Sequence, residues 1–292
     1  MMGFQGTKIN PKKFDRSQLK FYIILVPLAA FMLLPIVYMF SQAFKPLDEL
    51  FMFPPRFFAI NPTWKNFQDL MRTASTSGVP MSRYLFNSII ITITIVVATI
   101  FITAMSGYAL SKKKFKAKNT LFSINQAALM FVPVAVAIPR YLIIVNIGLV
   151  DNPLVHIIPA LAMPVGLFLV KQFIDQIPDV LIEAARLDGA GDFYILRKII
   201  IPLIVPALST VGILSFQAAW GATEASNIYI SDETMKTFSF YLSTLTSQAT
   251  GNGVAGAGMQ AAASLIMFLP NLIIFILMQS RVMNTMSHSG IK

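Results

Sequence analysis

The sequence has no cysteine and only two histidines among its 292 residues. Without cysteine the chain forms no disulfides and no thiolate chemistry, and its redox compartment stays open. We expect no metal site and no catalytic residues, because no metal cluster and no nucleophile–base pair stands inside the apolar runs. The Gly-x-x-x-x-Gly-Lys-Ser/Thr loop that cradles nucleotide phosphates is also missing, so we expect no ATP binding of the usual kind.

Charged residues are scarce as well. They make up 12% of the chain, about half the share in soluble domains, while 55% of the residues are hydrophobic. The mean hydropathy is +0.67. This composition predicts an all-α polytopic membrane protein. The net charge of +10 does not indicate nucleic-acid binding, because the basic residues cluster beside the apolar runs, where they orient a membrane protein.

Six apolar runs are long enough to cross a bilayer as helices. The predicted spans are 21–44, 83–110, 119–145, 153–173, 198–220 and 258–278. Ser41-Gln42-Ala43 resembles a signal-peptidase site, but the apolar run before it is longer than that of a signal peptide, so we expect an uncleaved span. The chain then divides into an N-terminal segment 1–20, a first span with its outer loop 21–82, a core of five spans 83–281 and a tail 282–292.

The distribution of basic residues predicts the orientation. Most of the 23 lysines and arginines fall in the segments that lie inside if the N-terminus is inside, although the two outer loops are the longest connections. The excess of positive charge marks the cytoplasmic side. We therefore expect both termini and the segment 174–197 in the cytoplasm.

A short charged segment between the fourth and fifth spans has the pattern of a compact helix. Pro178 suits the first helical position, and Gly189 suits the left-handed residue after the last turn. The residues that recur on one face as an apolar stripe are Val180, Ala184 and Leu187. These features predict a helix over 178–189 that a soluble partner could grip.

The residues of this segment also carry a resemblance. Glu183-Ala184-Ala185, then Gly189 and, after nine intervening residues, Ile199 with Pro202 are similar to the signature of permease subunits of bacterial ATP-binding-cassette (ABC) importers. The chain departs from it at Ile201, where leucine is usual. Softer similarities extend over nearly the whole chain and resemble the smaller permease of maltose-type and oligosaccharide systems. They lie at Phe51–Pro55, Asn87-Ser88, Gly107–Ser111, Leu269-Pro270 and the tail Ser289–Lys292.

The resemblance implies a type I ABC importer permease fold in the bacterial cytoplasmic membrane. It implies four kinds of partner: a second homologous permease, two ABC ATPase subunits, an extracytoplasmic solute-binding protein and a carbohydrate substrate. ATP and Mg²⁺ would be held by the ATPases, and this chain would need no cofactor. The residues expected to couple it to an ATPase are Glu183, Ala184, Ala185, Asp188, Gly189, Ile199 and Pro202.

Polar residues inside the spans are candidates for the substrate path, because they are costly in lipid and usually face a cavity. Thr210, Gln217, Trp220 and Glu224 recur at helical spacing along the fifth span. A tryptophan beside an amide and a carboxylate suits a sugar, and packing between helices with Trp220 and Glu224 at the interface fits equally well. Arg140 either lines the path or reaches the outer surface. Asn125 either lines a cavity or bonds a neighbouring helix.

Two further features concern the backbone and the outer loops. Pro133 and Pro139 in the third span, and Pro202 and Pro206 in the fifth, are expected to kink their helices. The segment 242–256 resembles the outer loop with which such permeases reach into the binding protein.

Other functions remain open at this stage. An importer of the same class for phosphate, amino acids or metal ions would share most of these features. An ion-coupled secondary transporter would show paired membrane-buried acids or an inverted repeat, and we find neither. An intramembrane enzyme would need a reactive pair inside the spans.

Overall fold

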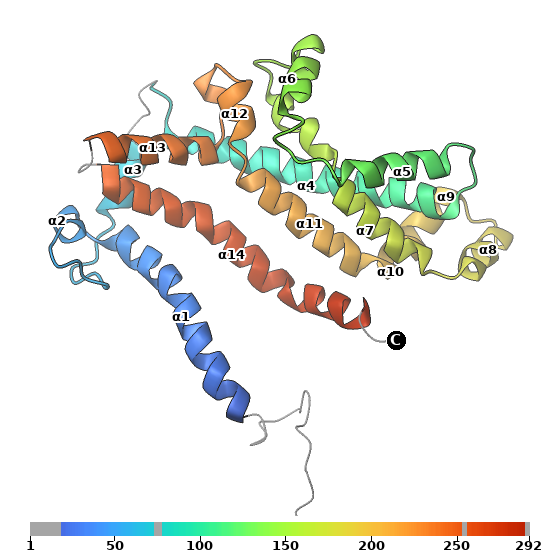
Figure 1. The fold of residues 1–292 in the computed structure, drawn as a ribbon, viewed down its shortest axis with the longest axis horizontal. Helices are drawn as coiled ribbons and strands as arrows, with labels where there is room; N and C mark the ends of the chain where they lie inside the picture. The colour runs from blue at the N-terminus through green and yellow to red at the C-terminus, as the bar shows by residue number, and fades with distance from the viewer. Residues whose placement is uncertain (1–18, 73–77, 253–255, 290–292) are drawn as a thin grey trace, which may run out of the picture. The chain divides into compact units, whose positions relative to one another are not determined.

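The computed structural model describes residues 19–72, 78–252 and 256–289, in which the regular elements are helices (Figure 1). The helices are α1 (Leu19–Phe44), α2 (Leu47–Leu50), α3 (Lys65–Arg72), α4 (Met81–Lys112), α5 (Lys118–Ala128), α6 (Ala137–Asn146), η2 (Pro153–His156), η3 (Pro159–Leu161), α7 (Pro164–Asp175), α8 (Asp179–Leu187), α9 (Asp192–Ile195), η4 (Leu196–Ile200), α10 (Ile201–Leu203), α11 (Val205–Trp220), α12 (Glu224–Ile228), η5 (Glu233–Met235), α13 (Phe238–Asn252) and α14 (Gly256–Ser289). The all-α prediction is confirmed. Residues 1–18 of the predicted N-terminal segment and 290–292 of the tail lie outside the described residues.

Three single helices are long and apolar enough to cross a membrane: α1, α4 and the Gly256–Met278 part of α14. Two bent pairs also qualify. Pro153–Leu161 meets Pro164–Asp175 at 41°, and Asp192–Leu203 meets Val205–Ile228 at 83°. The second bend falls between Pro202 and Pro206, where prolines remove backbone donors, so the predicted kink of the fifth span is confirmed.

The predicted third span, 119–145, is not one helix. α5 ends at Ala128 and α6 begins at Ala137, with turns between them around Pro133. Proline has no N–H and clashes with the preceding turn, and this explains why a continuous apolar run breaks here. The expected count of six spans therefore requires α5 and α6 to cross the bilayer together as a broken pair.

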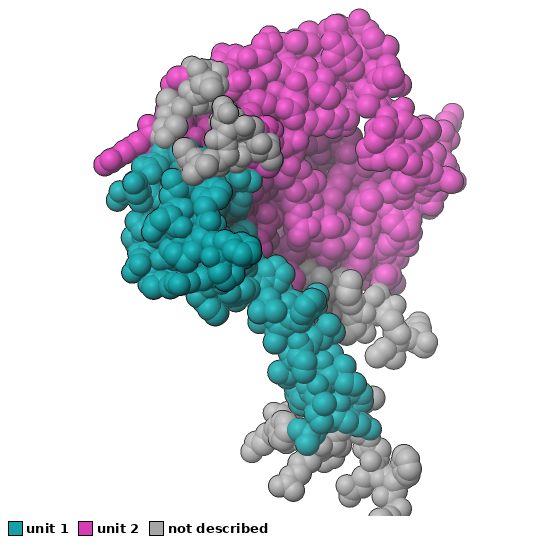
Figure 2. All heavy atoms as spheres, turned by 60° about the vertical axis from the view of Figure 1, so that its left-hand side comes forward, with its two compact units in different colours: residues 1–70, 248–265 teal, residues 71–247, 266–292 magenta. Residues whose placement is uncertain are grey.

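The chain separates into two compact units, residues 1–70 with 248–265 and residues 71–247 with 266–292 (Figure 2). In the first unit, the outer loop after α1 is ordered by buried polar groups. The Glu49 carboxylate accepts hydrogen bonds from the backbone N–H groups of Ile60 and Asn61, both at 2.9 Å. The Asn66 amide donates to the carbonyl oxygens of Ala43 and Lys45. Residues 45–70 of this loop are therefore folded, and they include α2 and most of α3. We call this segment the cap.

The second unit is organised around α4, which packs against α7 and α11. Gly107 lets α4 approach α7 closely, since a Cβ atom there would lie 2.8 Å from Val170 Cγ1. Near the first residue of α4, the Asn87 amide donates to the carbonyl oxygens of Thr234 and Lys236, at 2.8 and 2.9 Å. The helix is thus fixed along its length to segments that are distant in the sequence.

Candidate functional site

The predicted helix over 178–189 exists as α8. Pro178 precedes its first residue, and Asp188 follows its last. Gly189 has φ +83°, a left-handed conformation in which any other residue would be strained. The local rules for beginning and ending a helix therefore determine α8, as the sequence indicated.

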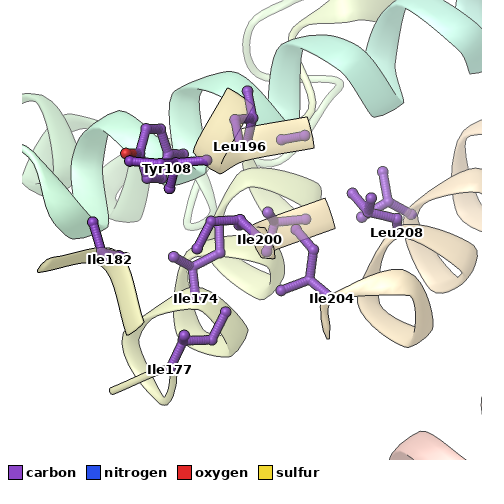
Figure 3. Close-up of a cluster of buried hydrophobic side chains, with 12 residues drawn as sticks. Tyr108, Ile174, Ile177, Ile182, Leu196, Ile200, Ile204 and Leu208 are labelled. Carbon is purple, nitrogen blue, oxygen red and sulfur yellow. The ribbon is translucent and has the colours of Figure 1, made fainter. Parts of the chain in front are cut away.

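The buried side of α8 is a single isoleucine that sequence reasoning did not identify. Ile182 is 3% exposed and belongs to a cluster of buried side chains from α4, α7, α9 and η4, including Tyr108, Ile174 and Leu196 (Figure 3). The expected apolar stripe faces away from this core. Val180 is 69% exposed and Leu187 is 90% exposed. The sequence does contain a signal for Ile182: it is the large apolar residue on the face of the helix opposite Val180, Ala184 and Leu187.

The other residues expected to couple the chain to a partner surround α8. Glu183 and Ala184 are exposed, and within the described chain Glu183 forms no ion pair, while Ala185 packs partly against the core. A hollow of about 550 Å³ opens beside the end of α8. Its lining residues are Ala185, Asp188, Gly189, Ala190, Gly191, Tyr194, Lys198 and Ile199. Pro202 lies apart, at the exposed bend between η4 and α11. The structure thus brings six of the seven residues together on α8 or in the hollow beside it, and leaves out Pro202.

The substrate-path candidates divide into two groups. Arg140 of α6 and Glu224 of α12 form an ion pair, although they are 84 residues apart. Beside them the rings of Tyr141 and Tyr229 stack with centroids 5.9 Å apart. Glu224 does not continue the helix of the predicted stripe, because α11 ends at Trp220 and Glu224 opens α12.

The remaining residues of the stripe have different environments. Trp220 is buried, and its indole Nε1 donates to the Met267 carbonyl oxygen at 2.9 Å. The Thr210 hydroxyl donates to the carbonyl oxygen of Pro206, one turn back in its own helix. Gln217 is exposed. The three residues therefore differ: Trp220 packs in the interior, Thr210 bonds its own helix and Gln217 is exposed. Their role in a substrate path stays a prediction.

Asn125 bonds a neighbouring helix and also lines a hollow, the two alternatives that the sequence left open. Its amide donates to the Pro164 carbonyl oxygen at 3.1 Å, where the bent span begins its second helix. The hollow, about 200 Å³, lies between α4, α5 and the break that precedes α7. Among the described residues, no group of three histidine or acidic side chains is placed to hold a metal ion.

Comparison with known proteins gives a consistent result. The model of the family described as "Binding-protein-dependent transport system inner membrane component" matches residues 99–280. The chain is 30% identical to the probable ABC transporter permease YurM of Bacillus subtilis over 290 residues, covering 95% of this chain and 92% of YurM. It is 28% identical over 269 residues to AraQ, the arabinooligosaccharide transport permease of the same organism, covering 90% and 93%.

Two further proteins complete the comparison. The sn-glycerol-3-phosphate transport permease UgpE of Pectobacterium atrosepticum is 28% identical over 249 residues, covering 85% of this chain and 88% of UgpE. The crystal structure of a bacterial ABC transporter involved in alginate import contains a chain that superposes with a TM-score of 0.75 at 21% identity. The match covers 92% of this chain and 99% of that chain, so the two share a fold.

Proposed function

Because this chain belongs to the family of inner membrane components of binding-protein-dependent transport systems, we propose that it lines the solute path of an ATP-driven importer and is driven through α8. The chain is a transport permease, not an enzyme, and it is a multi-pass protein of the cytoplasmic membrane. We assign the binding of ATP and Mg²⁺ to a separate ATPase subunit.

The observation that carries the coupling role is the two-sided character of α8. Ile182 anchors the helix in the core of its unit, whereas Leu187 and Val180 point outward. Val180, Ala184 and Leu187 share one exposed face of α8, and contiguous exposed apolar side chains are typical of a contact with another protein. An ATPase subunit that grips this face would move α8 when it closes on ATP, and the packed spans would follow as a rigid body.

The orientation in the membrane follows from the same assignment. An ATPase subunit is cytoplasmic, so α8 faces the cytoplasm, together with the lysines of 112–118. Both termini then lie on that side, in agreement with the positive-inside rule.

A second homologous permease completes the path. The turns between α5 and α6 carry highly exposed apolar side chains, among them Met130 at 85% and Val134 at 82%. Irregular backbone at membrane depth is tolerated only where protein covers it or where it lines a watery cavity. We assign this cover to the second permease. The family description names a binding protein. We place this protein on the extracytoplasmic side, where it would deliver the solute.

The cargo that best fits is a carbohydrate. AraQ, whose name specifies arabinooligosaccharides, aligns over nearly its whole length. UgpE supports the other cargo class, a phosphorylated polyol, at the same identity over a shorter stretch. The ion pair of Arg140 with Glu224 and the exposed Gln217 are the polar groups we place along the path. Both hydroxyl-bearing solutes would find donors and acceptors there.

The coupling role is tested by substituting the exposed face of α8. Leu187→Asp places a charge where an apolar contact is proposed, so ATPase subunits should no longer co-purify with the membrane subunits. Val150→Asp is the matched control, an exposed valine close to Asp151 and outside α8. Normal co-purification and uptake in Leu187→Asp would refute the role of α8.

The cargo is tested in proteoliposomes that contain the complete complex with its binding protein. The probes are radiolabelled arabinotriose, maltotriose and sn-glycerol 3-phosphate. Uptake of an oligosaccharide with ATP inside supports the carbohydrate assignment. Uptake of glycerol phosphate alone would replace it.

A further inference from the structure

The segment 112–118, from the last residue of α4 to the first of α5, contains five lysines, and two of them contact α8 or the segment that follows it. The Lys112 Nζ lies 2.7 Å from Asp179 Oδ1, in the first turn of α8, and donates to the carbonyl oxygen of Ile177 at 2.6 Å. The Lys112 side chain is only 7% exposed. A lysine placed solely to orient a membrane protein would extend into water, so burial of this ammonium indicates a structural contact.

The next lysine contacts the segment that follows α8. Lys113 forms an ion pair with Asp192, the first residue of α9, which follows α8 after Gly189 and Gly191. The Tyr108 hydroxyl lies 3.5 Å from the same carboxylate, and Arg186 of α8 lies 3.7 Å from it. Asp192 therefore joins α4, α8 and α9 at one point.

The two lysines bracket α8. Lys112 contacts its beginning and Lys113 contacts the segment just after its end, although the two lysines are neighbours: Lys112 ends α4 and Lys113 follows it. Hydrogen bonding to Lys112 lowers the pKa of Asp179, so this carboxyl stays ionised at cytoplasmic pH. A third contact ties α4 to the helix before α8, because the Ser111 hydroxyl donates to Asp175 Oδ1 at 2.5 Å.

Ion pairs of exposed side chains contribute little to stability, about 0–1 kcal/mol. Their effect here is geometric. Along the chain, α8 connects only to α7 and α9, through turns at Ile177–Pro178 and Asp188–Gly191. Such turns can flex, whereas the ion pair of Lys112 at the first residue of α8 and that of Lys113 with the first residue of α9 hold both turns against the end of α4.

We propose that Lys112 and Lys113 are positioning residues that lock α8 to the cytoplasmic end of α4, so that motion of α8 reaches this span directly. This inference rests on the proposed function of α8 as the contact with an ATPase. It adds a defined route: the force enters at α8 and passes through Asp179 and Asp192 to α4.

The chain offers a matched control in the same segment. Lys114 and Lys116 are exposed, and no ion pair joins them to another described residue. The double variants Lys112→Gln/Lys113→Gln and Lys114→Gln/Lys116→Gln remove the same charge from the same cytoplasmic segment. If these lysines only set the topology, both variants will behave alike.

The first measurement is ATP hydrolysis by the complete complex in proteoliposomes with its binding protein. In Lys112→Gln/Lys113→Gln the ATPase subunits should still co-purify, while the stimulation of hydrolysis by the binding protein should fall about fivefold or more. Lys114→Gln/Lys116→Gln should keep the stimulation. Restoration in Lys112→Asp/Asp179→Lys would show that the pairing matters and not the lysine itself. Equal stimulation in the two double variants would overturn the proposal.

The second measurement leaves all four charged side chains of the two ion pairs unaltered. Because the chain has no cysteine, spin labels can be placed at two exposed positions, Met105→Cys in α4 and Leu181→Cys in α8. The distance between them should be the same without nucleotide and with ATP and vanadate. A change of distance in this otherwise unaltered chain would overturn the lock. The proposed function of α8 is tested separately by Leu187→Asp: normal assembly of the complex and normal solute uptake in that variant would contradict it, whatever the outcome for the lysines.

Discussion

Trp220 donates its indole N–H to the carbonyl oxygen of Met267, and this bond ties the end of α11 to α14. Pro270 lies one turn further along α14 and has no N–H to donate to the carbonyl oxygen of Ile266, the residue before Met267. The indole thus bonds a carbonyl group next to the one that the proline leaves without its helical donor. The second aromatic ring at this place, Phe216, stacks on Trp220 with centroids 5.8 Å apart.

Substitutions of Trp220 separate the packing role from the sugar role. Trp220→Phe keeps the ring but removes the hydrogen bond, and should lower the free energy of unfolding by about 1 kcal/mol. Trp220→Ala also leaves a cavity and should cost about 3–5 kcal/mol. Thermal unfolding of the purified chain in detergent measures both. If Trp220→Phe has the stability of the unaltered chain but loses uptake, the tryptophan contacts substrate instead.

Gly107 provides a test of the close crossing of α4 and α7. A Cβ atom at this position would meet Val170 Cγ1 at 2.8 Å, and Val170 is fully buried. Gly107→Ala should therefore destabilise the chain by about 1–3 kcal/mol through overpacking. Val170→Ala in the same chain makes room and should recover part of the loss. Gly191→Ala is the control, because a Cβ atom there meets nothing within 4 Å. An additive loss in Gly107→Ala/Val170→Ala would contradict the steric explanation.

The sequence predicted the elements that depend on local properties. α1, α4 and α14 are continuous apolar runs, and the bounds of α8 follow from Pro178 and Gly189. Hydropathy alone could not show the break at 129–136, because the residues around Pro133 are as apolar as those of a span. The break is a backbone effect inside a uniform run of apolar side chains.

Contacts between residues far apart in the sequence determine the features that the sequence did not predict. The segment 242–256, expected as a loop, is helical to Asn252 as part of α13, despite serines, threonines and a glycine with weak helix propensity. The first turn of α13 is held by a long-range hydrogen bond: the backbone N–H of Phe238 donates to Ser88 Oγ, 150 residues earlier in the sequence. The pairing of Arg140 with Glu224 is likewise invisible in either local sequence. Residues 253–255 of that expected loop lie outside the described residues.

Asn87 should stabilise the segment before α13. Its amide donates to the carbonyl oxygens of Thr234 and Lys236, so Asn87→Ala leaves two acceptors without this donor. Asn87→Asp should be worse, because a carboxylate would face the same carbonyl oxygens. We expect losses of about 1–3 kcal/mol, and faster proteolysis near 231–237 in both variants. Ser82→Ala, an exposed substitution one turn earlier in α4, is the control. Equal stability of Asn87→Asp and the unaltered chain would contradict this assignment.

The cap in the first unit should depend on pH through Glu49. The backbone N–H groups of Ile60 and Asn61 donate to its carboxylate and lower its pKa below the usual value, against the opposing effect of burial. A lowered pKa in the folded state means that the carboxylate stabilises the cap above the usual pKa of glutamate. That contribution is lost as the pH falls through the lowered value.

Trp64 reports on this cap, because its ring packs edge-on against Phe44 with centroids 4.9 Å apart. In a Trp220→Phe background its fluorescence should stay constant from neutral pH down past the usual pKa of glutamate and change only at more acid pH. Glu49→Gln should show the altered spectrum already at neutral pH, since an amide has one acceptor oxygen for two N–H donors. Asp48→Asn, an exposed neighbour in α2, should behave like the parent. A transition at the same pH in Glu49→Gln and in the parent would assign the change to another carboxyl group.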